Sequence, residues 1–186
     1  FMVFNGLIKK VLRYNKEADL ELIEKAYNFS KEFTKGKFRS SGEPVIKHYL
    51  AVAYETAELR LDDKTIAAAL MHGLINKGAD PDKIKLLFGQ EIFSILDNIE
   101  RMTAIKRNIT KNTTNLENLK KVLLAASSDL RALLIKICDK LVNLRDLDAL
   151  PSIERKRIAK EAMEIYAPSS AQLSNHPHFS VCKSYL

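Results

Sequence analysis

Apolar residues recur at helical spacing along most of the chain, and they predict a series of amphipathic helices. The first two run from Asn5 to Arg13 and from Asp19 to Gly36, with Asp19 as the N-cap of the second. Further helices are predicted over residues 44–60, 62–78, 80–89 and 91–102. The segment 103–115 is dominated by Lys, Arg, Asn and Thr, so a mobile connection is predicted there.

Helical periodicity returns in the second half of the chain. Thr114 and Glu117 have the spacing of a capping box, and the last strong helix covers 151–166. Between them, Asp129 opens a helix whose core-facing stripe is predicted to be Leu130, Leu134, Ile137, Leu141 and Leu144. No segment alternates with the period of a strand, so an all-α fold is predicted, with one domain over 2–168 and an irregular tail over 169–186.

Two polar clusters interrupt the apolar pattern. His72 lies beside an apolar stripe near the end of the predicted 62–78 helix, and Asn76 follows one turn later, which predicts the rim of a pocket. In a later helix Asp139 and Asn143 share a mostly apolar face. Because a buried, unpaired carboxylate is costly, Asp139 requires a cation nearby, either a Lys or Arg side chain or a metal ion.

Composition narrows the class of protein. With 186 residues, 46% of them hydrophobic, the chain can bury one good core. No apolar run approaches the roughly 18 residues of a membrane span, and no secretory signal is recognisable, so we predict no membrane segment and a cytoplasmic protein. The two cysteines form no metal-binding pair, and Cys138 falls within an apolar helical pattern typical of a core residue.

The net charge of +7 favours an anionic partner such as a nucleotide, a nucleic acid or a membrane surface. The basic residues are nevertheless spread over many helices, and no aromatic residues are interleaved among them as stacking platforms. Nucleic-acid binding is therefore not favoured. Arg39, in the turn-rich loop between two predicted helices, is a candidate contact for an anion or a base, although composition and position alone favour a solvated loop arginine.

Five motifs in order along the chain carry a more specific signal: residues 18–27, 37–48, 67–72, 135–145 and 164–168. Together they resemble the HD hydrolase domain of the Rel/SpoT alarmone enzymes. The resemblance implies an all-helical domain that uses Mn²⁺ to remove the 3′-diphosphate from guanosine tetra- or pentaphosphate (ppGpp or pppGpp). It ends before the synthetase domain of the family, so a stand-alone domain without synthetase activity is expected.

The resemblance also implies roles for individual residues. His48, His72 and Asp139 match metal ligands, and imidazole and carboxylate groups suit a divalent ion that polarises the diphosphate and lowers the pKa of its coordinated water. Four further positions match residues that contact the nucleotide: Arg39, Ser41, Asn143 and Tyr166.

Several positions depart from the family pattern. Gly73 replaces the aspartate that follows the second histidine, which removes one anionic metal ligand. Asn76 and Lys77 replace the adjacent Glu-Asp pair that activates the attacking water, and neither an amide nor an ammonium group can act as a carboxylate base. Loss of a general base alone removes about 10²- to 10⁴-fold in rate. Asp146 stands where the family has a hydroxyl residue, and its charge would repel a nearby phosphate.

Three functions therefore compete. The first is a weak or inactive relative of the hydrolase that still binds a guanine nucleotide or a partner protein, with Mn²⁺ retained or lost. The second is an active Mn²⁺-dependent hydrolase with a compensated site. The third, a basic helical module for nucleic acid or protein, lacks a recognisable motif. The replacements favour the first function. Lys77 has two interpretations: a cation near Asp139 in a metal-free pocket, or a solvated residue at a helix end.

Overall fold

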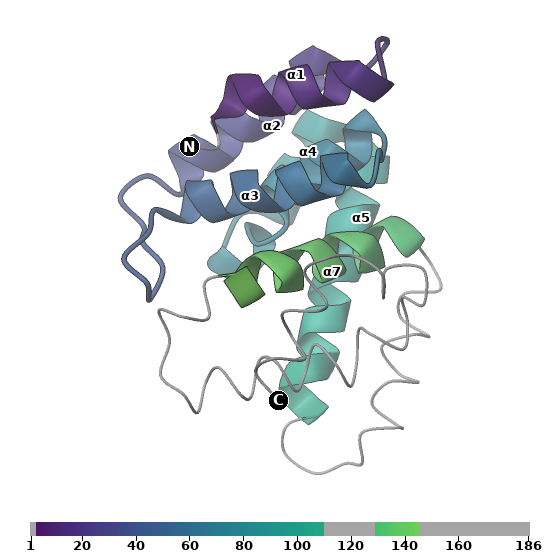
Figure 1. Ribbon diagram of the computed structural model, residues 1–186. Helices are drawn as coiled ribbons and strands as arrows, with labels where there is room; N and C mark the ends of the chain where they lie inside the picture. Colours follow the sequence, from purple (N-terminus) through teal and green to yellow (C-terminus); the bar gives the residue numbers. More distant parts are fainter. Residues whose placement is uncertain (1–2, 110–128, 146–186) are drawn as a thin grey trace.

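The computed structural model of the protein describes residues 3–109 and 129–145, which are built from helices (Figure 1). The elements are α1 (Phe4–Tyr14), α2 (Leu20–Phe33), α3 (Val45–Glu58), α4 (Asp63–Met71), the short 3-10 helix η1 (Ile75–Lys77), α5 (Pro81–Ile109) and α7 (Leu130–Arg145). Within the described ranges the only β-type pairing is an isolated bridge between Phe38 and Pro44. The predicted all-α fold is confirmed, whereas the predicted helices after residue 113, apart from α7, and the tail lie outside the described residues.

Helix α4 lies at the centre of the molecule. Every residue from Thr65 to Met71 is buried, and α4 packs against α2, α3, α5 and α7. A helix that is apolar around its whole circumference is stable only in the interior, which explains this position. Its N-terminus is capped as predicted, because the Asp62 side chain accepts a hydrogen bond of 2.7 Å from the backbone N–H of Thr65.

The end of α4 differs from the prediction. The helix stops at Met71 and does not continue to Gly78, so the prediction of one helix over 62–78 is wrong. Glycine is a poor helix former, and beyond Gly73 the backbone tightens into η1, which ends at Gly78 in the left-handed region with φ +92°. Asn76 therefore lies on a short, exposed turn and not on the face of a long helix.

Helix α5 is longer than predicted. The predicted break at Gly89 is present as a kink with φ +83°, but the helix continues through Ile109. The prediction of a mobile connection is therefore wrong over 103–109. Lys and Arg have high helix propensity, so a polar composition alone did not indicate a loop. The extension carries Thr103 on the same helix as Glu100.

Helix α7 packs against α3 and α5, as Figure 1 shows. Leu130, predicted to face the core, is 63% exposed, and Leu134 is only half-buried, so the predicted stripe is wrong at its first position and does not hold fully at its second. Ile137 and Leu141 are buried as predicted, and the side chain of Leu144 lies outside those described. Leu130 is the first residue of the helix, where the chain has not yet reached the packed interface. The observed core face consists of Ala132, Leu133, Ile135, Ile137, Cys138, Leu141 and Val142. As predicted, Cys138 is a core residue, and its burial raises the pKa of the thiol to about 12.

A network of charges fixes the start of α7. Arg131 pairs with Asp129 at 2.9 Å and with Glu91 of α5 at 2.7 Å, and it lies 3.7 Å from Asp62 before α4. These contacts join three helices at the end of α7 remote from Asn143. None of the described helices has both the length and the apolar character needed to cross a membrane.

Candidate metal and ligand site

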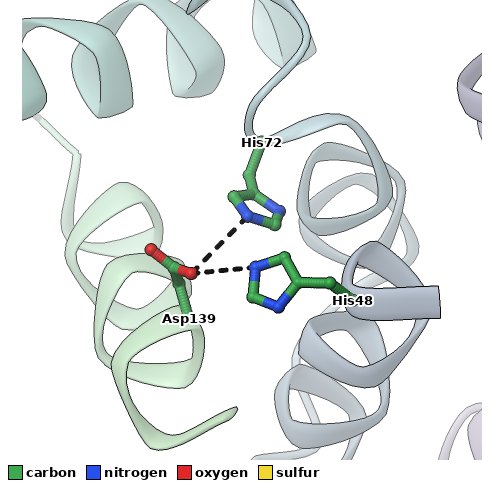
Figure 2. A group of neighbouring side chains, drawn as sticks. All are labelled: His48, His72 and Asp139. Atoms are coloured by element: carbon green, nitrogen blue, oxygen red, sulfur yellow. Dashed lines mark hydrogen bonds and ion pairs between the residues drawn. The ribbon is translucent and has the colours of Figure 1, made fainter. Parts of the chain in front are cut away.

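Three residues predicted as metal ligands meet in space. His48 comes from α3, His72 from the C-terminal end of α4 and Asp139 from α7, and Figure 2 shows both imidazole rings directed at the carboxylate. One potential ligand atom from each residue lies within 4.8 Å of the others. Each residue is at most 9% exposed. Helices far apart in sequence thus converge on a compact set of two nitrogen donors and one oxygen donor, which suits a divalent transition-metal ion.

His72 is oriented by the backbone of its own helix. Its Nδ1 donates a hydrogen bond of 2.7 Å to the carbonyl oxygen of Ala69, so Nε2 is left to face Asp139 at 3.8 Å. Burial lowers the pKa of His72 to about 4, although the negative charge of Asp139 acts to raise it. The ring is therefore neutral at pH 7, with Nε2 in the form that binds a metal.

Asp139 is an anion held by several donors. His48 Nε2 donates to its Oδ1 at 3.0 Å and Asn143 Nδ2 donates to the same oxygen at 2.9 Å, while Lys136 Nζ lies 3.4 Å from Oδ2. Burial acts to raise the pKa of Asp139, but the charge of Lys136 and the contacts with both histidines hold it well below its usual range. The cation predicted to lie beside this carboxylate is thus Lys136, which was not predicted from the sequence, and not Lys77.

A hydrogen-bonded chain connects this cluster to the loop before α3. Arg39 Nη2 donates to Asn143 Oδ1 at 2.7 Å, and Asn143 in turn donates to Asp139. Two of the predicted nucleotide contacts therefore lie next to the predicted metal ligands. Ser41 lies in the exposed turn of the same loop. Tyr166 and Asp146 lie outside the described residues.

The cluster opens into a cavity of about 250 Å³. This is smaller than the usual range for a drug-sized ligand, so the cavity suits a diphosphate group better than a whole nucleotide. Its cationic lining residues are Arg39, Lys77 and Lys136, and its carboxylates are Glu100 and Asp139. Gly73, Asn76 and the exposed Phe38 also line it, so the predicted pocket rim near His72 and Asn76 is present.

Besides Lys136, two further residues of this cavity, Tyr49 and Glu100, were not predicted from the sequence. Tyr49 follows His48 directly, and its ring packs on His72 with 4.7 Å between ring centroids. Burial, together with the charges of Asp139 and Glu100, raises the pKa of Tyr49 well above its usual value, so its hydroxyl keeps the proton. Glu100 lies within a regular stretch of α5 and is half-buried at the cavity. Neither residue belongs to a recognisable motif, so only the packing of the helices reveals them.

Comparisons with known proteins agree with this geometry. A family model described as "HD domain" matches residues 26–173. The chain is 36% identical over 168 residues to the GTP pyrophosphokinase rsh of Brucella melitensis, covering 90% of this chain and 22% of the relative. It is 34% identical over 175 residues to the bifunctional (p)ppGpp synthase/hydrolase SpoT of Escherichia coli K12, covering 94% of this chain and 25% of the relative. The chain thus spans about a quarter or less of the length of these relatives.

A solved structure also shares the fold. It comes from a study titled "A metazoan ortholog of SpoT hydrolyzes ppGpp and plays a role in starvation responses". It superposes with a TM-score of 0.63 at 18% identity and covers 88% of this chain and 93% of its own. At this level of identity the match supports the fold alone. Because most of both chains is covered, the matched protein chain is of similar length to this one.

Proposed function

Because the chain belongs to the HD-domain family and is homologous to the HD regions of the Rel/SpoT (p)ppGpp enzymes, we propose that it binds ppGpp or pppGpp and hydrolyses the 3′-diphosphate weakly or not at all. One observation carries this proposal. His48, His72 and Asp139 are assembled as a donor set, while the neighbouring positions 73, 76 and 77 hold no carboxylate. The site therefore retains groups for binding and lacks, at the end of α4, the carboxylates that the family pattern uses to activate water.

The donor set fits a divalent metal ion such as Mn²⁺. His72 is neutral with Nε2 available, and Asp139 is ionised and oriented by Asn143. With Gly73 in place of an aspartate, the protein supplies three ligands. A bound ion would supply Lewis-acid polarisation of a phosphoryl group.

The residues of the chain itself account for nucleotide binding. Arg39, Lys77 and Lys136 line the cavity. Arg39 lies 3.6 Å from Glu43 and Lys136 lies 3.4 Å from Asp139, so part of this charge is compensated, but the excess of cationic lining residues attracts a diphosphate. Arg39 is held half-buried by Asn143, so its guanidinium is already oriented for an anion or a base. In this proposal the diphosphate enters the cavity, the nucleoside extends over the loop that carries Ser41, and Tyr166 contributes as the family resemblance implies.

Weak hydrolysis follows from the residues at the end of α4. A general base must accept a proton near neutral pH, which the Asn76 amide and the charged Lys77 ammonium cannot do. Both side chains are exposed on η1.

An active hydrolase with a compensated site is the second candidate, and Glu100 favours it. This carboxylate lines the same cavity as His48, His72 and Asp139, from α5 and not from α4. In that case Glu100 would accept the proton of the attacking water.

The experiment that separates these functions combines binding and turnover. Calorimetric titration with ppGpp in the presence of Mn²⁺ measures affinity, and chromatography measures pyrophosphate release by the same sample. Binding with little or no release supports the proposal. Release that Glu100→Gln abolishes, while the exposed control Glu21→Gln leaves it unchanged, selects the second candidate. Absence of ppGpp binding by the folded protein contradicts both.

A further inference from the structure

The side chain of Tyr49 occupies the space into which a side chain at position 73 would project. A Cβ atom added to Gly73 would lie 2.5 Å from Tyr49 Oη, 3.1 Å from Cζ and 3.2 Å from Cε1. The first distance is shorter than any ordinary contact between non-bonded heavy atoms. The tyrosine is 2% exposed and is packed between helices, so its ring has little room to move away. A side chain at position 73 therefore requires the ring of Tyr49 to shift from its observed place.

The hydroxyl of Tyr49 is a buried polar group without a hydrogen-bond partner among the described residues. Such groups are rare, because burial removes water without a replacement, and each one requires an explanation. Tyr49 lines the cavity, and its ring contacts His72 edge-on at 4.7 Å and lies 6.0 Å from the ring of His48. The unpartnered donor is therefore a member of the site and not a remote packing defect.

The surroundings indicate what this donor would bind. The cavity has three cationic lining residues, Arg39, Lys77 and Lys136, and two carboxylates. Acids at positions 73, 76 and 77, as in the family pattern, would have made it strongly negative and dependent on a cation. In this chain Gly73, Asn76 and Lys77 occupy these positions, so none of them carries a negative charge. The polar group beside Gly73 is instead the neutral hydroxyl of Tyr49, which can donate a hydrogen bond. A neutral O–H donor in a cavity with more cationic than anionic lining residues suits an anionic oxygen that those cations hold, even though Asp139 and Glu100 also lie near the hydroxyl.

We propose that Tyr49 is a ligand-binding residue of this cavity. Its hydroxyl donates a hydrogen bond to a phosphoryl oxygen of the bound diphosphate. The hydroxyl lies where an acidic side chain at position 73 would otherwise lie. The ligand class rests on the proposed function. The position of the hydroxyl rests on the packing of Tyr49 against Gly73 and is independent of it.

The test removes the hydroxyl and keeps the ring. Tyr49→Phe and wild-type protein are titrated with inorganic pyrophosphate and with ppGpp, and their thermal unfolding is measured without ligand. We expect the variant to bind both probes about 10- to 100-fold more weakly, the value of one hydrogen bond to a charged group. The melting temperature of the free variant should not fall, because the deleted hydroxyl has no partner there. Tyr54→Phe, which removes a hydroxyl bonded to the Val3 carbonyl outside the cavity, is the control for binding.

The outcomes separate this inference from the proposed function. Unchanged affinity of Tyr49→Phe for both probes overturns the inference and leaves ppGpp binding intact. Binding of pyrophosphate that depends on Tyr49, without any binding of ppGpp, supports the inference and contradicts the proposed function. A wild-type protein that binds neither probe contradicts both.

A second measurement tests the placement without any ligand. Gly73→Ala adds the Cβ atom that meets Tyr49 Oη, so we expect a lower melting temperature, and combining it with Tyr49→Phe should recover part of the loss. The Oη contact is then gone, although the ring carbons at 3.1 and 3.2 Å remain close. Effects of the two substitutions that simply add would overturn the placement of the hydroxyl.

Discussion

His72 and Asp139 both make the folded protein less stable at low pH, because the pKa of each is lowered in the folded state. Burial lowers the pKa of His72 from an ordinary value near 6.5 to about 4, so the unfolded chain binds the extra proton between these values. Stability is therefore lost as pH falls through this window, by up to about 3 kcal/mol. Asp139, whose pKa is held well below its usual range, contributes stability above pH about 4 that is lost at lower pH.

Chemical denaturation at pH 7, 5.5 and 4.5 measures this prediction. The free energy of unfolding should fall steadily across the series in the wild-type protein. His72→Gln removes the titrating ring, so its unfolding free energy should change less between pH 7 and 4.5. If the two proteins respond equally to pH, other groups carry the acid sensitivity and the neutral state of His72 is not its cause.

At the level of residues, the sequence identified the groups with recognisable motifs and missed those without. The structure brings His48, His72 and Asp139 together and places Asn143 beside them. Tyr49 could not be recognised as a site residue, because it is adjacent to His48 and neighbouring residues of a helix are expected to point in different directions. Only the packing of three helices brings the side chains of both residues to one cavity. Lys136 was missed for a related reason, since a lysine three residues before an aspartate is common on any exposed helix face.

Helix α5 depends on a single residue for its shape. Gly89 has φ +83° and ψ 168°, a conformation that is essentially restricted to glycine, and an added Cβ would meet nothing within 4 Å. We expect Gly89→Ala to destabilise the protein by about 1–3 kcal/mol through backbone strain alone. The neighbouring exposed Gln90→Ala is the matched control and should stay within about 0.5 kcal/mol.

Equilibrium denaturation measures both variants. Because the segment after the kink carries Glu100 and Thr103 to the cavity, Gly89→Ala should also weaken pyrophosphate binding, whereas Gln90→Ala should not. Equal stability of Gly89→Ala and wild type would mean that the chain can adopt an unkinked path without loss.

At the level of elements, capping residues and glycines predicted boundaries better than polarity did. Asp19 and Asp62 cap α2 and α4 as expected, because the aspartate side chain satisfies a backbone N–H that the helix leaves free. The polar segment over 103–109 was predicted to be a loop, yet α5 extends through it, and its Lys and Arg residues are good helix formers. The end of α4 was misjudged because Gly78 gives a clear stop signal, while the earlier change to η1 has a weaker one.

The site links parts of the molecule that are distant in sequence, since α3, α4 and α7 each supply one candidate ligand. A metal ion bound to all three would stabilise the folded state and not the unfolded chain. Mn²⁺ at one hundred times its Kd should therefore add about 2.7 kcal/mol to the free energy of unfolding. A chelator should reverse this gain, and thermal unfolding measures it directly.

Two variants decide whether the gain comes from this site. Asp139→Asn removes the only carboxylate of the donor set and should abolish the response to Mn²⁺. Asp82→Asn, an exposed residue at the start of α5, should preserve it. A response that survives in Asp139→Asn would place the bound ion elsewhere on the molecule.

Restoring the missing acids tests whether the fold as a whole still supports hydrolysis. Gly73→Asp, Asn76→Glu and Lys77→Asp together would return the carboxylates of the family pattern, but the new side chain at 73 would collide with Tyr49. We therefore expect the triple variant to remain poor, and a quadruple variant that also carries Tyr49→Leu to gain about 10²- to 10⁴-fold in Mn²⁺-dependent release of pyrophosphate from ppGpp.

The quadruple variant also separates two explanations for weak turnover. If turnover rises only when Tyr49 is replaced, then Tyr49 and Gly73 together account for the weak turnover. The arrangement of helices around His48 and Asp139 would then still support hydrolysis. If a folded quadruple variant binds Mn²⁺ and ppGpp without any gain, loss of the acids is not the cause. Asp146 would then be the next position to change, because it follows Arg145 directly and its charge opposes a phosphate.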